Sequence, residues 1–199
     1  MNLTIREARV EESPRLAELM NIAGEGLPAH LWASMAGSAA DAMALGARRV
    51  ARPEGAFSHA NAYVATSRGE IAGMLLSYRL PDACESEPMD EVPAVVRPLL
   101  ALEALVPGSW YINAVATASA YRGQGVGSTL MQLAEQLAMK SGADALSLIV
   151  AEQNVAARRL YERLGYREMA RQAIIQFPGC PHTGDWVLMK KALGHIDSP

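Results

Sequence analysis

The spacing of apolar and polar residues changes several times along this chain, and each spacing predicts one kind of element. Alternating or β-branched stretches predict strands at 3–8, 61–66, 70–80, 110–117, 145–150, 167–176 and 186–191. Helical spacing predicts a helix that opens at Ser13-Pro14, with Ser13 as its cap. It also predicts one or two helices between His30 and Arg52, with a break at Gly37, and an amphipathic helix from Val126 to Ala138.

Glycine and proline mark the connections between these elements. Gly24, Gly26 and Pro28 are predicted to end the first helix, and Arg68-Gly69 to form a hairpin turn. The segment 81–108 combines five prolines with acidic residues at Glu85, Glu87, Asp90 and Glu91. A loop with one short helix near 94–104 is expected there, because proline does not fit the interior of a sheet.

Composition narrows the class of protein. The chain has 199 residues of which 50% are apolar, enough for one sizeable core, so a single domain over 1–199 is predicted, with 81–108 as an insertion and 194–199 as a tail. A net charge of −3 with mixed signs argues against a nucleic-acid surface. No apolar run is long enough for a membrane span, and the charged N-terminus does not resemble a signal peptide. Cys84 and Cys180 form no close pair, which fits a reducing, cytoplasmic location.

The candidate chemistry begins where the strand from Trp110 meets the following helix. Gly123, Gly125 and Gly127 lie in the connecting turn, directly after Arg122. The first N–H groups of a helix have no partner within it, and glycine lets a phosphate approach the backbone closely. A pyrophosphate is therefore the expected ligand. The turn lacks the lysine of a Walker loop, and its glycine spacing differs from the dinucleotide fingerprint.

Two motifs together point to a family. The pattern Arg122-x-x-Gly125-x-Gly127 after a strand resembles the acetyl-CoA signature of the GNAT superfamily of N-acetyltransferases. The later segment 154–166 resembles a second motif of that family, with matches at Asn154, Ala157, Leu160, Tyr161, Gly165 and Tyr166. This second spacing is also reasonable without the family, because Asn is a good N-cap and Gly165 suits a left-handed residue after a helix.

The resemblance, which covers Leu3 to Leu193, implies a fold and a cosubstrate. The fold is α+β, a mixed and mostly antiparallel sheet of about seven strands flanked by helices and splayed at its two central strands. The cosubstrate is acetyl-CoA, the acceptor is an amine of a small molecule or protein, and a homodimer is plausible for the family. We expect the helical stretch before Phe57 and the segment 81–108 to cover the acceptor side.

Site roles follow from the same resemblance. The Val115 N–H is the expected oxyanion donor, and Tyr161 the expected general acid beside the sulfur. Asn154 is expected to bond the pantetheine arm or a nearby backbone group. The full expected cofactor set is Ala114, Val115, Ala116, Thr117, Arg122, Gly123, Gln124, Gly125, Val126, Gly127, Ser128, Asn154 and Tyr161. Tyr161 could instead be a core tyrosine and Asn154 only an N-cap.

The general base is left open by the sequence. Many family members carry a Glu on the central strand, but the corresponding position here is near Tyr111, with Asn113 beside it. His59, Glu152, His182 or water are the candidates. The missing carboxylate supports an alternative, an acyl-CoA-binding regulatory module without turnover, whereas Tyr161 argues against it. A phosphate-binding α/β domain of another kind is the third class. No metal-ligand or hydrolase motif is present, and the acceptor is not determined.

Overall fold

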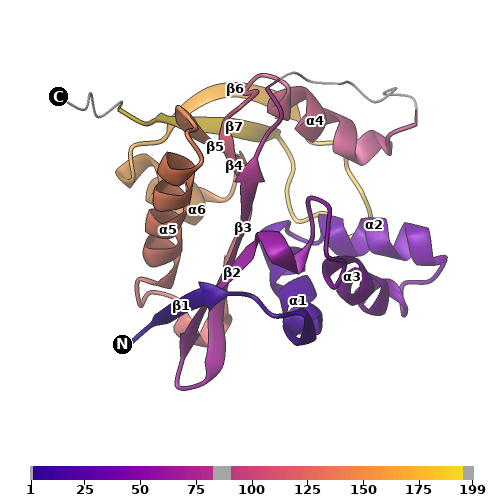
Figure 1. The fold of residues 1–199 in the computed structure, drawn as a ribbon. Helices are drawn as coiled ribbons and strands as arrows, with labels where there is room; N and C mark the ends of the chain where they lie inside the picture. The colour runs from indigo at the N-terminus through magenta and orange to yellow at the C-terminus, as the bar shows by residue number, and fades with distance from the viewer. Residues whose placement is uncertain (1, 83–90, 195–199) are drawn as a thin grey trace. The chain divides into compact units, whose positions relative to one another are not determined.

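The computed structural model describes residues 2–82 and 91–194, and its strands form one sheet in the hydrogen-bonded order β1-β2-β3-β4-β5-β7-β6 (Figure 1). The strands are β1 (Thr4–Glu7), β2 (Ala62–Ser67), β3 (Glu70–Arg79), β4 (Trp110–Thr117), β5 (Ala145–Ala151), β6 (Arg167–Ala173) and β7 (Asp185–Ala192). The β1–β2, β2–β3, β5–β7 and β6–β7 ladders are antiparallel, and β4–β5 is parallel. The predicted α+β class and its mostly antiparallel sheet are confirmed.

Six α-helices accompany the sheet in the part of the chain that the structure describes. They are α1 (Ser13–Ala23), α2 (Leu27–Ala36), α3 (Ala42–Val50), α4 (Arg97–Glu103), α5 (Val126–Lys140) and α6 (Val155–Arg163). One or two helices were predicted between His30 and Arg52, and the structure has two, α2 and α3, of which α2 begins earlier, at Leu27. Gly37, the predicted break, ends α2 in the left-handed conformation with φ 71°. Among the described residues, no helix is long and apolar enough to cross a membrane.

Two details at the start of the chain correct the sequence analysis. Ser13 is not the N-cap of α1: the cap position is Glu12, and the Ser13 hydroxyl donates to the Val10 carbonyl at 2.6 Å. A 3₁₀ turn at Val10–Glu12 leads directly into the helix and moves its start by one residue. Pro28 is not part of the break between helices either, because it lies in the first turn of α2, where a missing N–H costs nothing.

The chain divides into two compact units, and the first comprises Met1–Tyr78, Asn113–Ala134 and Pro178–Pro181. Its core joins one face of α1 to α3 and to β2, β3 and β4, through residues such as Leu16, Val50, Met74 and Ala116. Figure 1 shows α1, α2 and α3, in indigo to purple, grouped together. The β2–β3 hairpin turns at Arg68 and Gly69, both at positive φ, as a two-residue turn requires. The predicted hairpin is thereby confirmed.

The second unit comprises Arg79–Ile112, Glu135–Phe177 and His182–Pro199. It contains β5, β6 and β7 with α4 and α6, and α4 packs against β6 and β7. The short helix predicted near 94–104 is confirmed as a 3₁₀ turn (Ala94–Val96) followed by α4. Cys84, the acidic residues Glu85, Glu87 and Asp90, and most of the 194–199 tail lie outside the described residues. That the whole chain forms a single domain stays a prediction.

Candidate functional site

Two glycines of the turn between β4 and α5 have a left-handed backbone. Gly123 and Gly125 adopt positive φ of 72° and 84°, a region that residues with a Cβ rarely enter. Arg122 to Gly125 are exposed, and α5 begins at Val126. The Thr129 N–H donates to the Gly125 carbonyl at 3.0 Å. The N–H groups of the first helical turn precede Thr129 in the chain, before this helical hydrogen bond. This turn can therefore present several N–H donors and one guanidinium to an anion.

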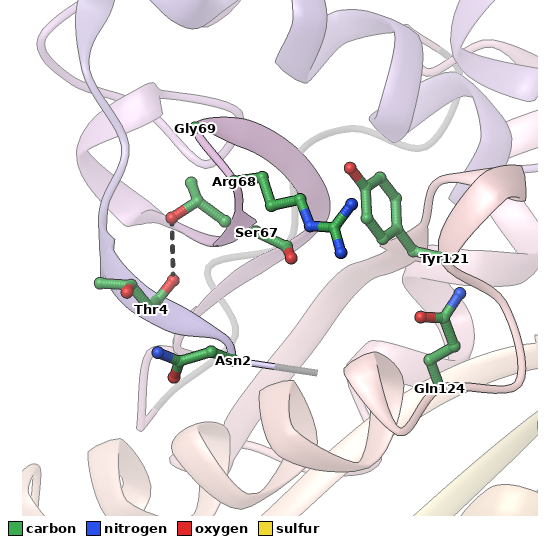
Figure 2. Close-up of a pocket in the computed structure, with 8 residues that line it drawn as sticks. Asn2, Thr4, Ser67, Arg68, Gly69, Tyr121 and Gln124 are labelled. Carbon is green, nitrogen blue, oxygen red and sulfur yellow. Dashed lines mark hydrogen bonds between the residues drawn. The ribbon is translucent and has the colours of Figure 1, made fainter.

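An open pocket of about 800 Å³ adjoins this turn in the first unit. It is lined by Asn2, Thr4, Thr66, Ser67, Arg68, Gly69, Tyr121 and Gln124. Figure 2 shows the Arg68 side chain directed from the hairpin toward Tyr121, with Gln124 farther along the turn. The Tyr121 hydroxyl donates to Glu70 at 2.7 Å, and this hydrogen bond raises the pKa of Tyr121. The pocket therefore has a cationic side chain beside the glycine turn.

Between two flanking hydrogen bonds, the chain segment that contains β4 is one residue longer than the segment of β3 that it faces. The Leu80 N–H bonds the Ser109 carbonyl at 2.9 Å, and the Ala118 N–H bonds the Ala72 carbonyl at 2.9 Å. Between these two bonds the chain advances nine residues on the β4 side and eight on the β3 side, counted from those four residues. An antiparallel pair with one additional residue on one strand contains a β-bulge. A bulge frees backbone N–H and C=O groups from the ladder.

The pairing of β4 with β5 is short. The parallel ladder consists of Trp110–Ile112 against Leu146–Leu148, three residue pairs. β4 continues beyond it to Thr117, and β5 continues to Ala151. The predicted oxyanion donor Val115 and its neighbours Ala114, Ala116 and Thr117 all lie in this continuation of β4.

Close packing fixes the same part of β4 against β3 and α5. A Cβ added at Gly73 would lie 2.7 Å from the Ala116 carbonyl oxygen and 2.7 Å from Val126 Cγ1. Glycine at this position of β3 therefore lets the β4 backbone approach closely, an approach that no sequence pattern indicated.

Asn154 is a helix cap, as one of its two sequence-based interpretations holds. Its Oδ1 accepts the Ala157 N–H at 3.2 Å, immediately before α6. The cap satisfies one of the four N–H groups that a helix start leaves without a partner in the helix. Any contact between Asn154 and a ligand stays a prediction.

Tyr161 lies near the end of α6, where the chain closes in a Schellman motif. Gly165 has a φ of 92°, its N–H bonds the Glu162 carbonyl at 3.1 Å, and the Tyr166 N–H bonds the Tyr161 carbonyl at 3.0 Å. The ring centroids of Tyr161 and Tyr166 lie 6.0 Å apart. Tyr161 is 8% exposed and Tyr166 is 2% exposed. Burial raises the pKa of Tyr166. The helix end thus fixes the direction of the Tyr161 side chain.

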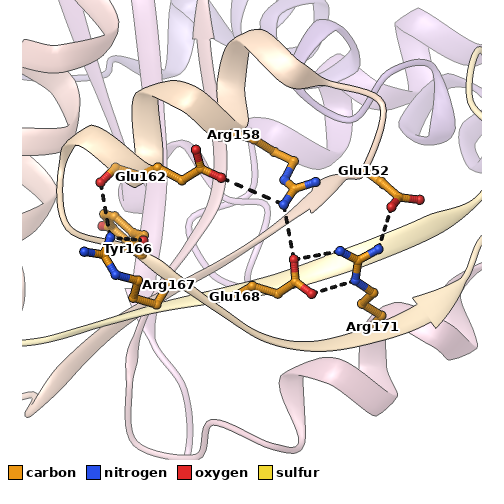
Figure 3. A network of polar contacts seen from close by, with 7 residues as sticks. All are labelled: Glu152, Arg158, Glu162, Tyr166, Arg167, Glu168 and Arg171. Carbon is orange, nitrogen blue, oxygen red and sulfur yellow. Dashed lines mark hydrogen bonds and ion pairs between the residues drawn. The ribbon is translucent and has the colours of Figure 1, made fainter.

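A network of ion pairs joins α6 to β6 and to the end of β5 (Figure 3). Arg158 lies 3.1 Å from Glu168 and 3.8 Å from Glu162, and Arg171 bonds both Glu168, at 2.6 Å, and Glu152. The hydrogen bond from Arg171 lowers the pKa of Glu168. The network therefore holds the helix that carries Asn154 and Tyr161 to its neighbouring strand.

We expect Arg171→Ala to lower the free energy of unfolding, because it removes the one cation that pairs with both Glu152 and Glu168. Chemical denaturation at neutral pH measures this. A carboxyl with a lowered pKa stabilises the fold only while ionised, so the loss should shrink as the pH falls through the carboxyl range. Arg15→Ala, which breaks a single exposed pair with Glu18, is the control and should change stability much less. Equal losses for the two variants would contradict a network effect.

The candidate bases occupy different surroundings. The Nδ1 of His59 lies 3.2 Å from the Val50 carbonyl in the first unit. Glu152 and the loop of His182 lie together in the second unit, because Gln153 donates to the Thr183 hydroxyl at 2.9 Å. The Glu152 carboxylate is ion-paired with Arg171.

One titratable group was missed by the sequence analysis. Glu103, the last residue of α4, bonds Tyr111 of β4, and burial raises the pKa of its carboxyl to about 7. A single glutamate near the end of a short helix has no sequence signal that distinguishes it from a surface residue. Among the described residues, no group of three His, Cys, Asp or Glu could hold a metal ion.

Comparison with known proteins identifies the family and agrees with the fold. A family model described as the acetyltransferase (GNAT) family matches residues 38–166. A solved acetyltransferase is similar to the chain with a TM-score of 0.65 and 23% identity, over 96% of this chain and 100% of that one. An N-acetyltransferase from Staphylococcus aureus Mu50 has a TM-score of 0.63 and 18% identity, over 94% and 99%. The yncA protein of Salmonella typhimurium, solved with acetyl-CoA, has a TM-score of 0.59 and 17% identity, over 100% and 98%. At these identities the structures establish the fold, and no curated protein sequence matches the chain.

Proposed function

The chain belongs to the acetyltransferase (GNAT) family and is an acyltransferase, and from this premise we propose that it transfers the acetyl group of acetyl-CoA to a primary amine. The amine, on a small molecule or a protein, would attack the thioester directly. The observation that carries the proposal is the exposed glycine turn that follows Arg122 and opens onto the start of α5. Its N–H groups and its guanidinium suit a pyrophosphate, which acetyl-CoA carries.

The turn supplies the cofactor contacts in this proposal. The backbone of Gly123 to Ser128 would bond the pyrophosphate oxygens, and Arg122 would pair with their charge. Positive φ at Gly123 and Gly125 supports this role, because it turns successive N–H groups toward one side. Nothing lies within 4 Å of a Cβ built on either glycine, so the space beside the turn is open.

The bulged strand would hold the reacting group. A tetrahedral adduct of the thioester carries a negative oxygen, which a backbone N–H already directed at it stabilises. The N–H of Val115 is the proposed donor, and the backbone of Ala114 to Thr117 would bond the pantetheine arm. The extra residue of β4 and its short ladder with β5 support this assignment, because both free peptide groups of the strand.

The helix α6 would serve the leaving group. Tyr161 would donate its hydroxyl proton to the departing CoA thiolate, and Asn154 would bond the pantetheine arm or a nearby backbone group. A phenol has an ordinary pKa of about 10 and a thiol of about 8.5, so this transfer is only slightly uphill.

The test has two parts: calorimetric titration with acetyl-CoA, then mass spectrometry of a panel of primary amines incubated with protein and acetyl-CoA. The panel includes a polyamine, amino acids, aminoglycosides and peptides with free N-termini. Saturable binding and an acetylated product support the proposal. Binding without any product would instead favour the regulatory module, and no binding by folded protein would overturn both. A homodimer and a cytoplasmic location stay predictions.

A further inference from the structure

The open pocket beside the glycine turn is built entirely from the first compact unit. Strands β1 and β2 and the β2–β3 hairpin supply part of its lining, and the segment after β4 supplies Tyr121 and Gln124. Gln124 stands between Gly123 and Gly125 in the chain, so the lining includes a residue of the candidate pyrophosphate turn. With a volume of about 800 Å³, the pocket has room for a ligand group next to that turn.

Among the described residues that line this pocket, Arg68 alone is charged. Across residues 2–82 and 91–194, no carboxylate is paired with its guanidinium. The neighbouring Glu70 instead accepts a hydrogen bond from Tyr121 at 2.7 Å, and it lines a separate pocket of about 410 Å³. The Arg68 guanidinium, which Figure 2 shows directed toward Tyr121, is therefore open to an anionic ligand.

Groups that can donate hydrogen bonds line the pocket with this guanidinium. Thr4 and Ser67 contribute hydroxyl groups, and the Gln124 amide uses one of its two N–H groups on the Ala120 carbonyl, at 3.0 Å. An arginine binds two phosphate oxygens at once, and a phosphate monoester carries roughly −1.5 to −2 charge at pH 7. A pocket with one arginine, several neutral donors and no carboxylate among its described lining residues suits such a group.

Arg68 also occupies a backbone position at which arginine is unfavourable. It has a φ of 51° and Gly69 has a φ of 84°, and two-residue turns with both φ values positive favour Asn, Asp or Gly at the first position. A Cβ in this region strains the backbone, and residues held in such conformations cluster at binding sites. The hairpin therefore presents an arginine side chain where asparagine would stabilise the turn more.

We propose that this pocket binds a phosphate monoester and that Arg68 is the residue that selects it. The source that fits the neighbouring turn is the 3′-phosphate of acetyl-CoA, because that phosphate and the pyrophosphate are attached to the same ribose. This source rests on the proposed function. A separate small phosphorylated ligand has the same chemistry, and the experiment distinguishes the two sources.

The experiment measures, by calorimetry, the affinity of wild type and Arg68→Ala for acetyl-CoA and for 3′-dephospho-acetyl-CoA. We expect the wild type to bind acetyl-CoA about 10-fold more tightly than the dephospho form, a difference of about 1.4 kcal/mol. Arg68→Ala should bind both forms with the affinity that the wild type has for the dephospho form. In a second arm, phenyl phosphate, a simple phosphate monoester, is titrated into wild type saturated with acetyl-CoA. It should not bind, because the 3′-phosphate already occupies the pocket.

Two control variants separate binding from folding. Arg68→Asn removes the guanidinium but suits the turn, so it should raise the melting temperature while losing the preference for the 3′-phosphate. Arg48→Ala removes an exposed arginine from the last turn of α3 and should keep the wild-type preference.

The remaining outcomes distinguish this inference from the proposed function. If the wild type binds acetyl-CoA but neither prefers the 3′-phosphate nor binds phenyl phosphate, or if Arg68→Ala keeps the wild-type preference, the inference is wrong while the proposed function stands. Phenyl phosphate that binds the acetyl-CoA-saturated wild type and not Arg68→Ala would support the pocket and assign it a separate ligand. If acetyl-CoA does not bind the folded wild type, the proposed function fails. Phenyl phosphate titrated alone then decides the pocket: binding that Arg68→Ala abolishes supports it, and no binding overturns it.

Discussion

Replacing Arg122 and Gly125 by alanine together should weaken acetyl-CoA binding by at least about 100-fold, or roughly 2.7 kcal/mol. Arg122 is exposed in the turn and would lose its charge-assisted hydrogen bonds to the pyrophosphate. Gly125 has a φ of 84°, where a Cβ strains the backbone and turns the following N–H groups away from the phosphate. Isothermal titration calorimetry with acetyl-CoA and with CoA measures the loss.

A matched double variant separates binding from folding. Gly142 has a φ of 70°, beyond the end of α5, and nothing lies within 4 Å of a Cβ built on it. Arg48 is an exposed arginine in the last turn of α3. Arg48→Ala with Gly142→Ala therefore repeats the charge change and the backbone strain away from the turn, and should bind acetyl-CoA as the wild type does. If the Arg122 and Gly125 variant binds normally, the pyrophosphate assignment is wrong.

Tyr161→Phe should lower kcat by about 100-fold while leaving the affinity for acetyl-CoA unchanged, because it removes one acid that acts only in the transition state. The ring stays, so the packing against Tyr166 at 6.0 Å is kept and the helix end should fold as before. Steady-state kinetics with the acceptor found in the amine panel, together with calorimetry, give both numbers.

The neighbouring tyrosine provides the control for this prediction. Tyr166 is 2% exposed and contacts Tyr161, yet nothing in the proposed chemistry uses its hydroxyl. Tyr166→Phe removes the same hydroxyl group from the neighbouring ring and should keep the wild-type kcat. Equal losses in the two variants would show that Tyr161 acts through packing. No loss in Tyr161→Phe would assign the proton to water or to another residue.

Much of the fold could be predicted because local spacing decides it. The strands and helices follow from periodicity, and every predicted element among the described residues is present within a few positions. The errors lie at helix starts: Ser13 and Pro28 were misplaced because a preceding 3₁₀ turn and a tolerated proline at a first turn move a boundary without changing the hydrophobic pattern.

The features of the candidate site also divide into those that the local sequence predicts and those that it does not. The left-handed Gly165 and the cap at Asn154 were readable from sequence, because each is a local requirement of a helix end. The sequence also indicated a glycine turn at 123–127, but not the left-handed backbone of Gly123 and Gly125. The close approach at Gly73, the extra residue of β4 and the network around Arg171 were not readable. Each depends on a strand or helix that is distant in the sequence.

By itself, the sequence determined the order of elements, the family motifs and the turn that suits a pyrophosphate, because these depend on residues a few positions apart. Only the tertiary structure decided that Glu103 lies against Tyr111, where burial raises its pKa, and that Glu152 is ion-paired with Arg171. The physical reason is that a proton affinity depends on burial and on neighbouring charges. Both arise only when distant segments pack together.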